Sequence, residues 1–145
     1  MKTRYLIPIF GLLLIGFADT VLSQETNKPS STDSMAAKVV GVWTRESQHT
    51  DTSFEFVYTY RAGGDYTEKS TRTFKGKATI TNGSGTWEVK DGMLITTEIK
   101  SDSGTPGTMN ALHRALVTRG KIVRVSDREM VLHFGAGDEA LKRRD

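Results

Sequence analysis

The chain has 145 residues, a formal net charge of +3 and no cysteine. The basic residues are scattered apart from the run 142–144. A nucleic-acid-binding surface needs clustered basic residues, so we expect no nucleic-acid partner. Without cysteine no disulfide framework can form, and the fold must depend on its hydrophobic core. The length allows one domain after the N-terminal segment.

Residues 1–23 are predicted to be a secretory signal peptide. A short basic start precedes the largely apolar run 6–18. This run is shorter than the roughly 20 residues that a membrane-spanning helix needs, which favours a cleaved signal peptide over an uncleaved anchor. Cleavage fits best after Ser23, with Ala18 as the alternative. Because no cysteine follows that could carry a lipid, we expect a secreted or periplasmic protein with no membrane span after cleavage.

Residues 24–35 are polar, with Pro29 and several serines, and are predicted to form a flexible linker. The domain then occupies residues 36–145. Ser34 can cap a short helical turn at its start.

The most informative pattern lies at residues 53–60, where every second residue is aromatic. Successive side chains of a strand point to opposite faces, so this spacing predicts a strand with four rings on one face. Gly63 and Gly64 follow and predict a hairpin turn. The next strand, residues 65–74, is unusually polar. It is expected either at a sheet edge or on the wall of a polar cavity.

The rest of the domain has the same pattern of short strands and glycine-containing turns. Further strands are predicted at 39–47, 78–81, 86–89, 93–100, 112–125 and 129–134, where 112–125 is either one bent strand or two. Turns are predicted at 75–77, 82–85, 90–92 and 126–128. A helical turn is predicted from Asp138. The spacing of strands fits a sandwich or a barrel. A barrel leaves no open edge, and about eight strands can enclose one small ligand. We therefore predict an all-β fold, a single antiparallel up-and-down barrel of 7–8 strands.

Four segments resemble lipocalins and their small secreted bacterial lipocalin-like relatives. Gly41-Val42-Trp43 resembles the Gly-x-Trp motif at the start of the first strand. Residues 60–66, 85–94 and 122–132 resemble two internal hairpin units and the closing hairpin of those proteins, in the same order. The resemblance implies a barrel open at one end. It also implies that Gly41 and Trp43 close the other end, with the tryptophan packed against a basic residue near the last strand, for which Arg124 is the candidate.

No arrangement of residues predicts catalysis. The three histidines, His49, His113 and His133, lack metal-ligand spacing, and no nucleophile or phosphate-binding motif occurs. The strand glutamates, Glu55, Glu68, Glu88 and Glu98, are assigned to the solvated face, where alternation puts polar residues. We expect a protein that is not an enzyme and has no catalytic residue, metal or cofactor.

The predicted function is binding of a small apolar or amphipathic ligand at the barrel mouth. Tyr58, Tyr60 and Tyr66 would line the mouth, with Arg72 as a partner for an anion and with Phe54 and Phe56 deeper in the barrel. The alternative is a protein-interaction or hydrolase-inhibitor-type barrel that acts through the loop 101–110, the longest unpatterned stretch of the domain.

Overall fold

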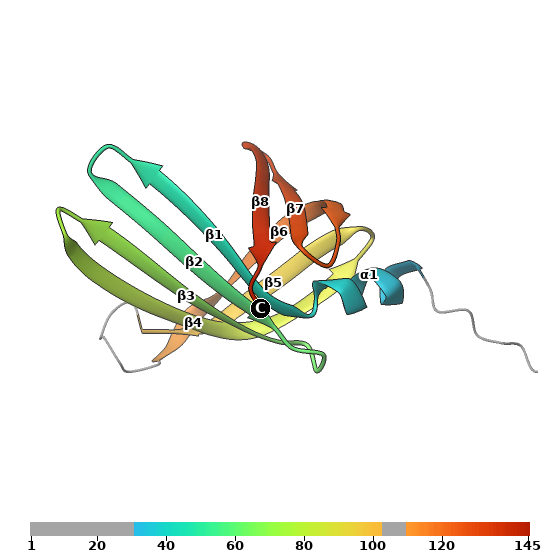
Figure 1. The fold of residues 1–145 in the computed structure, drawn as a ribbon. Helices are drawn as coiled ribbons and strands as arrows, with labels where there is room; N and C mark the ends of the chain where they lie inside the picture. The colour runs from blue at the N-terminus through green and yellow to red at the C-terminus, as the bar shows by residue number, and fades with distance from the viewer. Residues whose placement is uncertain (1–30, 103–109) are drawn as a thin grey trace, which may run out of the picture.

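The structure, a computed structural model, describes residues 31–102 and 110–145, in which one helix is followed by eight strands (Figure 1). The predicted signal peptide, 1–23, and the first part of the predicted linker lie outside these ranges. Within them, no helix is long and apolar enough to cross a bilayer.

The elements are α1 (Ser31–Val39), β1 (Gly41–His49), β2 (Thr52–Tyr60), β3 (Asp65–Phe74), β4 (Lys77–Lys90), β5 (Met93–Ser101), β6 (Asn110–Val125), β7 (Glu129–Phe134) and β8 (Gly137–Arg143). Each strand pairs antiparallel with its neighbours in sequence, and β1 pairs with β8, so the sheet is a closed barrel. The prediction of an all-β fold, a single antiparallel up-and-down barrel, is confirmed, with eight strands.

Helix α1 begins four residues before the predicted end of the flexible linker. Asp33 lies in its first turn, where a negative charge favours the helix N-terminus. Met35 and Ala36 pack against the hydrophobic core, and α1 lies beside β4 and β6. Burial of these apolar side chains anchors the helix to the barrel, which the polar composition of the linker did not indicate.

The turn predicted at 82–85 is wrong, because β4 runs through it as one strand of 14 residues. Its pairing with β5 shifts register between Ser84 and Gly85, which marks a β-bulge. A Cβ on Gly85 would lie 1.8 Å from the carbonyl oxygen of Thr97. Glycine is therefore needed here for close approach of two strands and not for a turn.

The structure also decides between the predictions for two C-terminal segments, residues 112–125 and the segment from Asp138. Residues 112–125 belong to one strand, β6, and not to two. The helical turn predicted from Asp138 is wrong: this segment is β8, which pairs along its length with β7. Leu141 is only 2% exposed, and its burial in the core explains why the segment extends as a strand.

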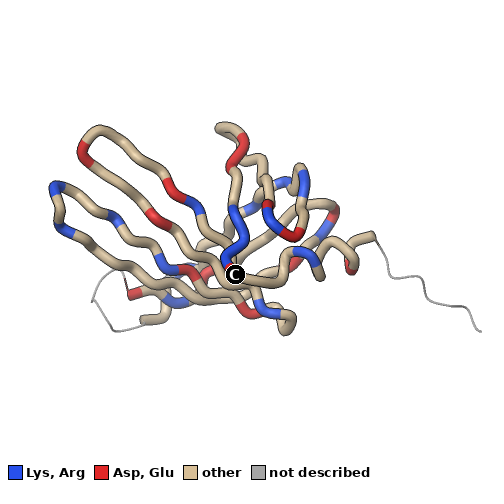
Figure 2. Tube along the Cα trace, in the orientation of Figure 1, with Lys and Arg blue, Asp and Glu red and all other residues tan. Residues whose placement is uncertain are grey.

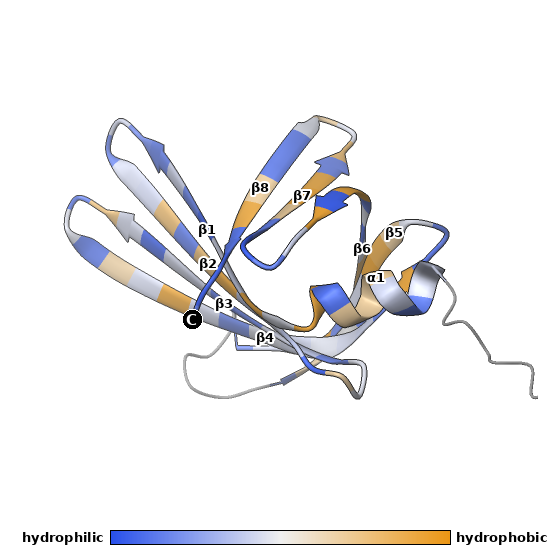
Figure 3. Cartoon of the chain, turned by 45° about the vertical axis from the view of Figure 1, so that its right-hand side comes forward, coloured by the Kyte–Doolittle hydropathy of each residue, from blue (hydrophilic) through white to orange (hydrophobic). Residues whose placement is uncertain are grey.

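The hydrophobic core fills the end of the barrel beside α1. Its buried members include Val39, Trp43, Trp87, Met130 and Leu141. Trp43 is completely buried and donates a hydrogen bond from Nε1 to the carbonyl of Val39, at 2.7 Å. Figure 3 shows hydrophobic stretches along β5 and β7.

The basic residue that packs on Trp43 is Arg143, and the prediction of Arg124 is wrong. The Arg143 guanidinium lies 4.3 Å from the centre of the Trp43 ring and donates hydrogen bonds to the carbonyls of Val40 and Lys38. Arg124 is 63% exposed and pairs with Glu129 at 2.6 Å. The sequence predicts a helical turn for the segment that forms β8, and a helical turn does not place Arg143 beside Trp43.

Gly41 permits this arrangement. Its φ of +143° is one that side chains rarely adopt, and a Cβ there would lie 2.2 Å from Nη1 of Arg143. Gly41, Trp43 and Arg143 therefore form the closure of this end of the barrel.

The contact between β1 and β8 is short. Only Trp43–Arg143 and Thr44–Lys142 are paired in register. Beyond these pairs the two strands diverge, and the hairpins β1–β2 and β3–β4 extend away from the helix end (Figure 1). An ion pair between Arg45 and Glu139 bridges the strands just past the last backbone pair. The barrel is thus closed firmly at the helix end and opens toward the other end. Figure 2 shows basic and acidic residues interspersed along these strands.

Candidate functional site

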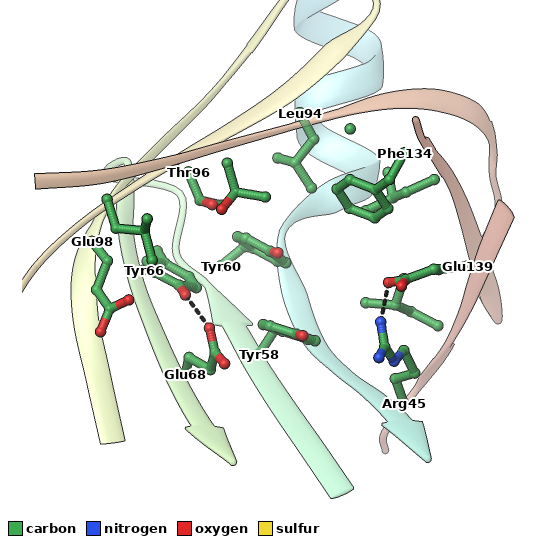
Figure 4. Close-up of a pocket in the computed structure, with 15 residues that line it drawn as sticks. Arg45, Tyr58, Tyr60, Tyr66, Glu68, Leu94, Thr96, Glu98, Phe134 and Glu139 are labelled. Atoms are coloured by element: carbon green, nitrogen blue, oxygen red, sulfur yellow. Dashed lines mark hydrogen bonds and ion pairs between the residues drawn. The ribbon is translucent and has the colours of Figure 1, made fainter. Parts of the chain in front are cut away.

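A cavity of about 360 Å³ lies above the core, inside the barrel. Its floor is apolar and includes Leu94, Leu132 and Leu141, which also belong to the core. Its walls carry three tyrosines, three glutamates and one arginine (Figure 4). The cavity therefore combines an apolar floor with polar and charged groups at the sides, as small-molecule sites do.

The three tyrosines that the sequence singled out, Tyr58, Tyr60 and Tyr66, all line this cavity. They belong to a continuous row of nearly parallel rings. Ring centroids are 6.2 Å apart for Phe54 and Phe56, 6.1 Å for Phe56 and Tyr58, 6.4 Å for Tyr58 and Tyr60, and 5.8 Å for Tyr60 and Tyr66.

The depth of this row is the reverse of the prediction. Tyr60 is only 4% exposed and packs edge-on against Trp87, whereas Phe54 and Phe56 are half-buried and lie toward the open end. The reason is the direction of β2, which enters from the open end and finishes at the hairpin beside the core. Alternation identifies the face of a strand but not which end is deep.

The hydroxyl of Tyr60 has no hydrogen-bond partner within the described ranges, although the side chain is almost fully buried. In Figure 4 it points into the cavity. Burial raises the pKa of Tyr60 far above its usual value, so the hydroxyl stays protonated. This hydroxyl faces the cavity, where a ligand can supply its hydrogen-bond partner.

Two glutamates line one wall of the cavity, Glu68 of β3 and Glu98 of β5, so their predicted place on the solvated face is wrong. Glu68 accepts a hydrogen bond of 2.5 Å from the Tyr66 hydroxyl. Burial and the neighbouring charge of Glu68 raise the pKa of Glu98. Neither carboxylate has a lysine or arginine partner among the described residues. Glu55 and Glu88 are exposed and do not line the cavity, as the strand alternation predicts.

Two glycines make room for side chains of the cavity wall. A Cβ on Gly83 would lie 2.6 Å from the Glu98 carboxylate, and one on Gly120 would lie 2.8 Å from the Phe134 ring.

The sequence contains a signal that Glu68 lines the cavity, because Glu68 shares a strand face with Tyr66, two residues earlier. It contained none for Glu98, whose position depends on a register shift between β5 and β6.

The basic residue of the cavity is Arg45 and not Arg72. Arg45 forms an ion pair with Glu139 and stacks over Phe56, with 4.8 Å between its guanidinium carbon and the ring centre. Arg72 is exposed, does not line the cavity and lies near Phe74 toward the open end. The predicted role of Arg72 as an anion partner in the cavity is therefore wrong. Because Arg45 is already paired, its charge is largely compensated.

The remaining predicted sites give less information. Within the described ranges, no group of three or more potential ligands could hold a metal ion. His133 pairs with Asp138 at 2.7 Å on the surface. Of the loop 101–110, residues 103–109 lie outside the described ranges, so the alternative interaction site there stays a prediction. Ser101 and Asp102, before it, are buried.

No family model matches the chain, and no curated protein matches it. Among solved structures, the crystal structure of a lipocalin-like protein from Bacteroides uniformis is similar, with a TM-score of 0.46 and 11% identity over 74% of this chain and 99% of that one. The assignment of fold depends on the strand order, in which eight antiparallel strands follow one another around the barrel and the last pairs with the first. This strand order is that of an up-and-down antiparallel barrel, the architecture that lipocalins have.

Proposed function

We propose that this protein binds one small amphipathic molecule in the cavity of its barrel, without chemical conversion. The observation that carries the proposal is the cavity itself. Its volume of about 360 Å³ lies near the lower end of the range of about 300–1,000 Å³ found for small-ligand sites. Since residues 1–23 are predicted to be a secretory signal peptide, we expect this binding to take place outside the cytoplasm.

The lining supports an amphipathic ligand over a purely apolar one. Leu94, Leu132 and Leu141 offer an apolar floor, while the hydroxyl of Tyr60 faces the cavity without a protein partner in the described ranges. A hydrocarbon would leave that hydroxyl unsatisfied, at a cost of about 1–3 kcal/mol. A ligand with one polar group can satisfy it and still bury an apolar body.

A neutral fluorescent dye, N-phenyl-1-naphthylamine, tests this proposal. We expect saturable binding at one site per protein, with enhanced dye fluorescence. Thr96→Trp, which places an indole in the cavity, should abolish the signal. The adjacent Thr97 does not line the cavity, so Thr97→Trp is the matched control and should bind as the wild type does.

Both variants are first checked for cooperative thermal unfolding. Absence of dye binding to the folded wild type, or equal binding to Thr96→Trp and Thr97→Trp, contradicts the proposal.

A further inference from the structure

We propose that the polar group of the ligand is a protonated primary or secondary amine, held by Glu68, Glu98 and the hydroxyl of Tyr60. This inference rests on the proposed function and names the chemical class of ligand. The preferred compound is a small alkyl or arylalkyl amine whose apolar body lies on the floor of the cavity.

The charge of the cavity favours a cation. Its lining has three carboxylates and one guanidinium, and Arg45 is paired with Glu139. Glu68 and Glu98 then remain on one wall without a cationic partner among the residues described. Carboxylates that are partly removed from water repel each other, and a cation between them relieves that repulsion. The raised pKa of Glu98 agrees with such repulsion.

The hydrogen-bonding groups also select a donor. Carboxylates only accept, and the proton of the Tyr66 hydroxyl is already donated to Glu68 at 2.5 Å. A primary ammonium carries three N–H donors, enough for both carboxylates and the oxygen of Tyr60, and a secondary ammonium carries two, enough for the two carboxylates. A quaternary ammonium has no donor to offer, which is why a primary or secondary amine fits better.

Aromatic rings next to the carboxylates favour the same class of ligand. Tyr60 and Tyr66 line the cavity, with 5.8 Å between their ring centres. Aromatic rings attract cations that lie within about 6 Å of the ring centre. Figure 4 shows Tyr66 beside Glu68 and Glu98, and Tyr60 nearer the middle of the cavity. The apolar body of the amine would then extend toward Leu94 and Phe134.

Three compounds with the same chain length test the inference: n-octylamine, 1-octanol and octanoate. Each is titrated at pH 7.5 by calorimetry and by displacement of N-phenyl-1-naphthylamine. We expect octylamine to bind at least about tenfold more tightly than octanol, and octanoate to bind most weakly, since one charged hydrogen bond is worth roughly that factor.

The double variant Glu68→Gln/Glu98→Gln should lose most of the preference for octylamine and keep its affinity for octanol. Glu55→Gln/Glu88→Gln removes two charges from exposed strand positions outside the cavity and is the matched control. Tyr60→Phe should reduce octylamine binding less than the double variant does.

The possible failures are distinguishable. If dye and octanol bind but octylamine binds no more tightly, or if the double variant leaves its affinity unchanged, the amine inference is wrong and the ligand-binding proposal stands. If neither the dye nor any of the three compounds binds to the folded protein, both are wrong.

Discussion

Replacing Arg143 by alanine should lower the free energy of unfolding by about 2–3 kcal/mol. The variant loses a part-buried hydrogen bond of 2.9 Å to the carbonyl of Val40 and an exposed one of 2.7 Å to that of Lys38. Together these are worth about 1.5–2 kcal/mol when the exposed bond is counted at the low end. The contact of the guanidinium with Trp43, at 4.3 Å, adds about 0.5–1 kcal/mol.

The assay is urea unfolding followed by tryptophan fluorescence, to which buried Trp43 contributes directly. For a domain of this size the loss corresponds to a fall of about 8–12 °C in Tm. Arg124→Ala is the matched control, because its exposed ion pair with Glu129 is worth about 0–1 kcal/mol.

Gly41→Ala extends the test to a double-mutant cycle. Its Cβ would lie 2.2 Å from Nη1 of Arg143, so the two changes should be strongly non-additive. In the Arg143→Ala background only the cost of the positive φ should remain. If Arg143→Ala destabilises the protein no more than Arg124→Ala does, Arg143 does not close the barrel and the reasoning is refuted.

Three further predictions concern the strands and the cavity. Gly85→Ala should lower the free energy of unfolding in urea by about 2–3 kcal/mol, because its Cβ would lie 1.8 Å from the Thr97 carbonyl oxygen. Gly135→Ala, with open space around it, is the control and should be near neutral. Similar values for both variants would argue against the bulge. Leu141→Ala, at a position 2% exposed, should cost about 3 kcal/mol, and a loss under about 0.5 kcal/mol would show that β8 does not contribute to the core. Burial and Glu68 raise the pKa of Glu98 above 4.5, so the folded state binds this proton more tightly and stability falls as pH rises through that window. Glu98→Gln should therefore be more stable than the wild type at pH 7 and equal to it near pH 4, and lower stability at pH 7 would contradict the assignment.

The fold was largely predictable because the barrel is made of local hairpins. Alternating aromatic residues in β2, followed by Gly63 and Gly64, correctly predict the hairpin of β2 and β3. Errors arose where glycine has more than one use. Gly83 and Gly85 resemble a turn in sequence, but their lack of side chains is needed for Glu98 and for the backbone of β5. That information lies in a neighbouring strand and not in the local sequence.

The candidate site was predictable only in part, for the same reason. Tyr58, Tyr60 and Tyr66 share a face by simple alternation and line the cavity together. The pairing of Glu68 with Glu98 depends instead on how β3, β4 and β5 align, and the register shift at Glu98 sets that alignment. A period of two residues says which side chains face inward. It cannot say which ones meet across the barrel.

The short junction between β1 and β8 has a consequence for how the protein folds. Thr44 and Lys142, which meet there, are 98 residues apart in sequence, whereas every other strand pair is a neighbour along the chain. Ordering so long a loop costs more entropy than forming any hairpin. Only two backbone pairs in register, with the Arg45–Glu139 ion pair and the contacts of Arg143, offset that cost. The hairpins should therefore assemble first into an open, curved sheet, and joining of the first and last strands should complete folding. Until then both outer strands can pair with another molecule, so refolding at high protein concentration should favour aggregation.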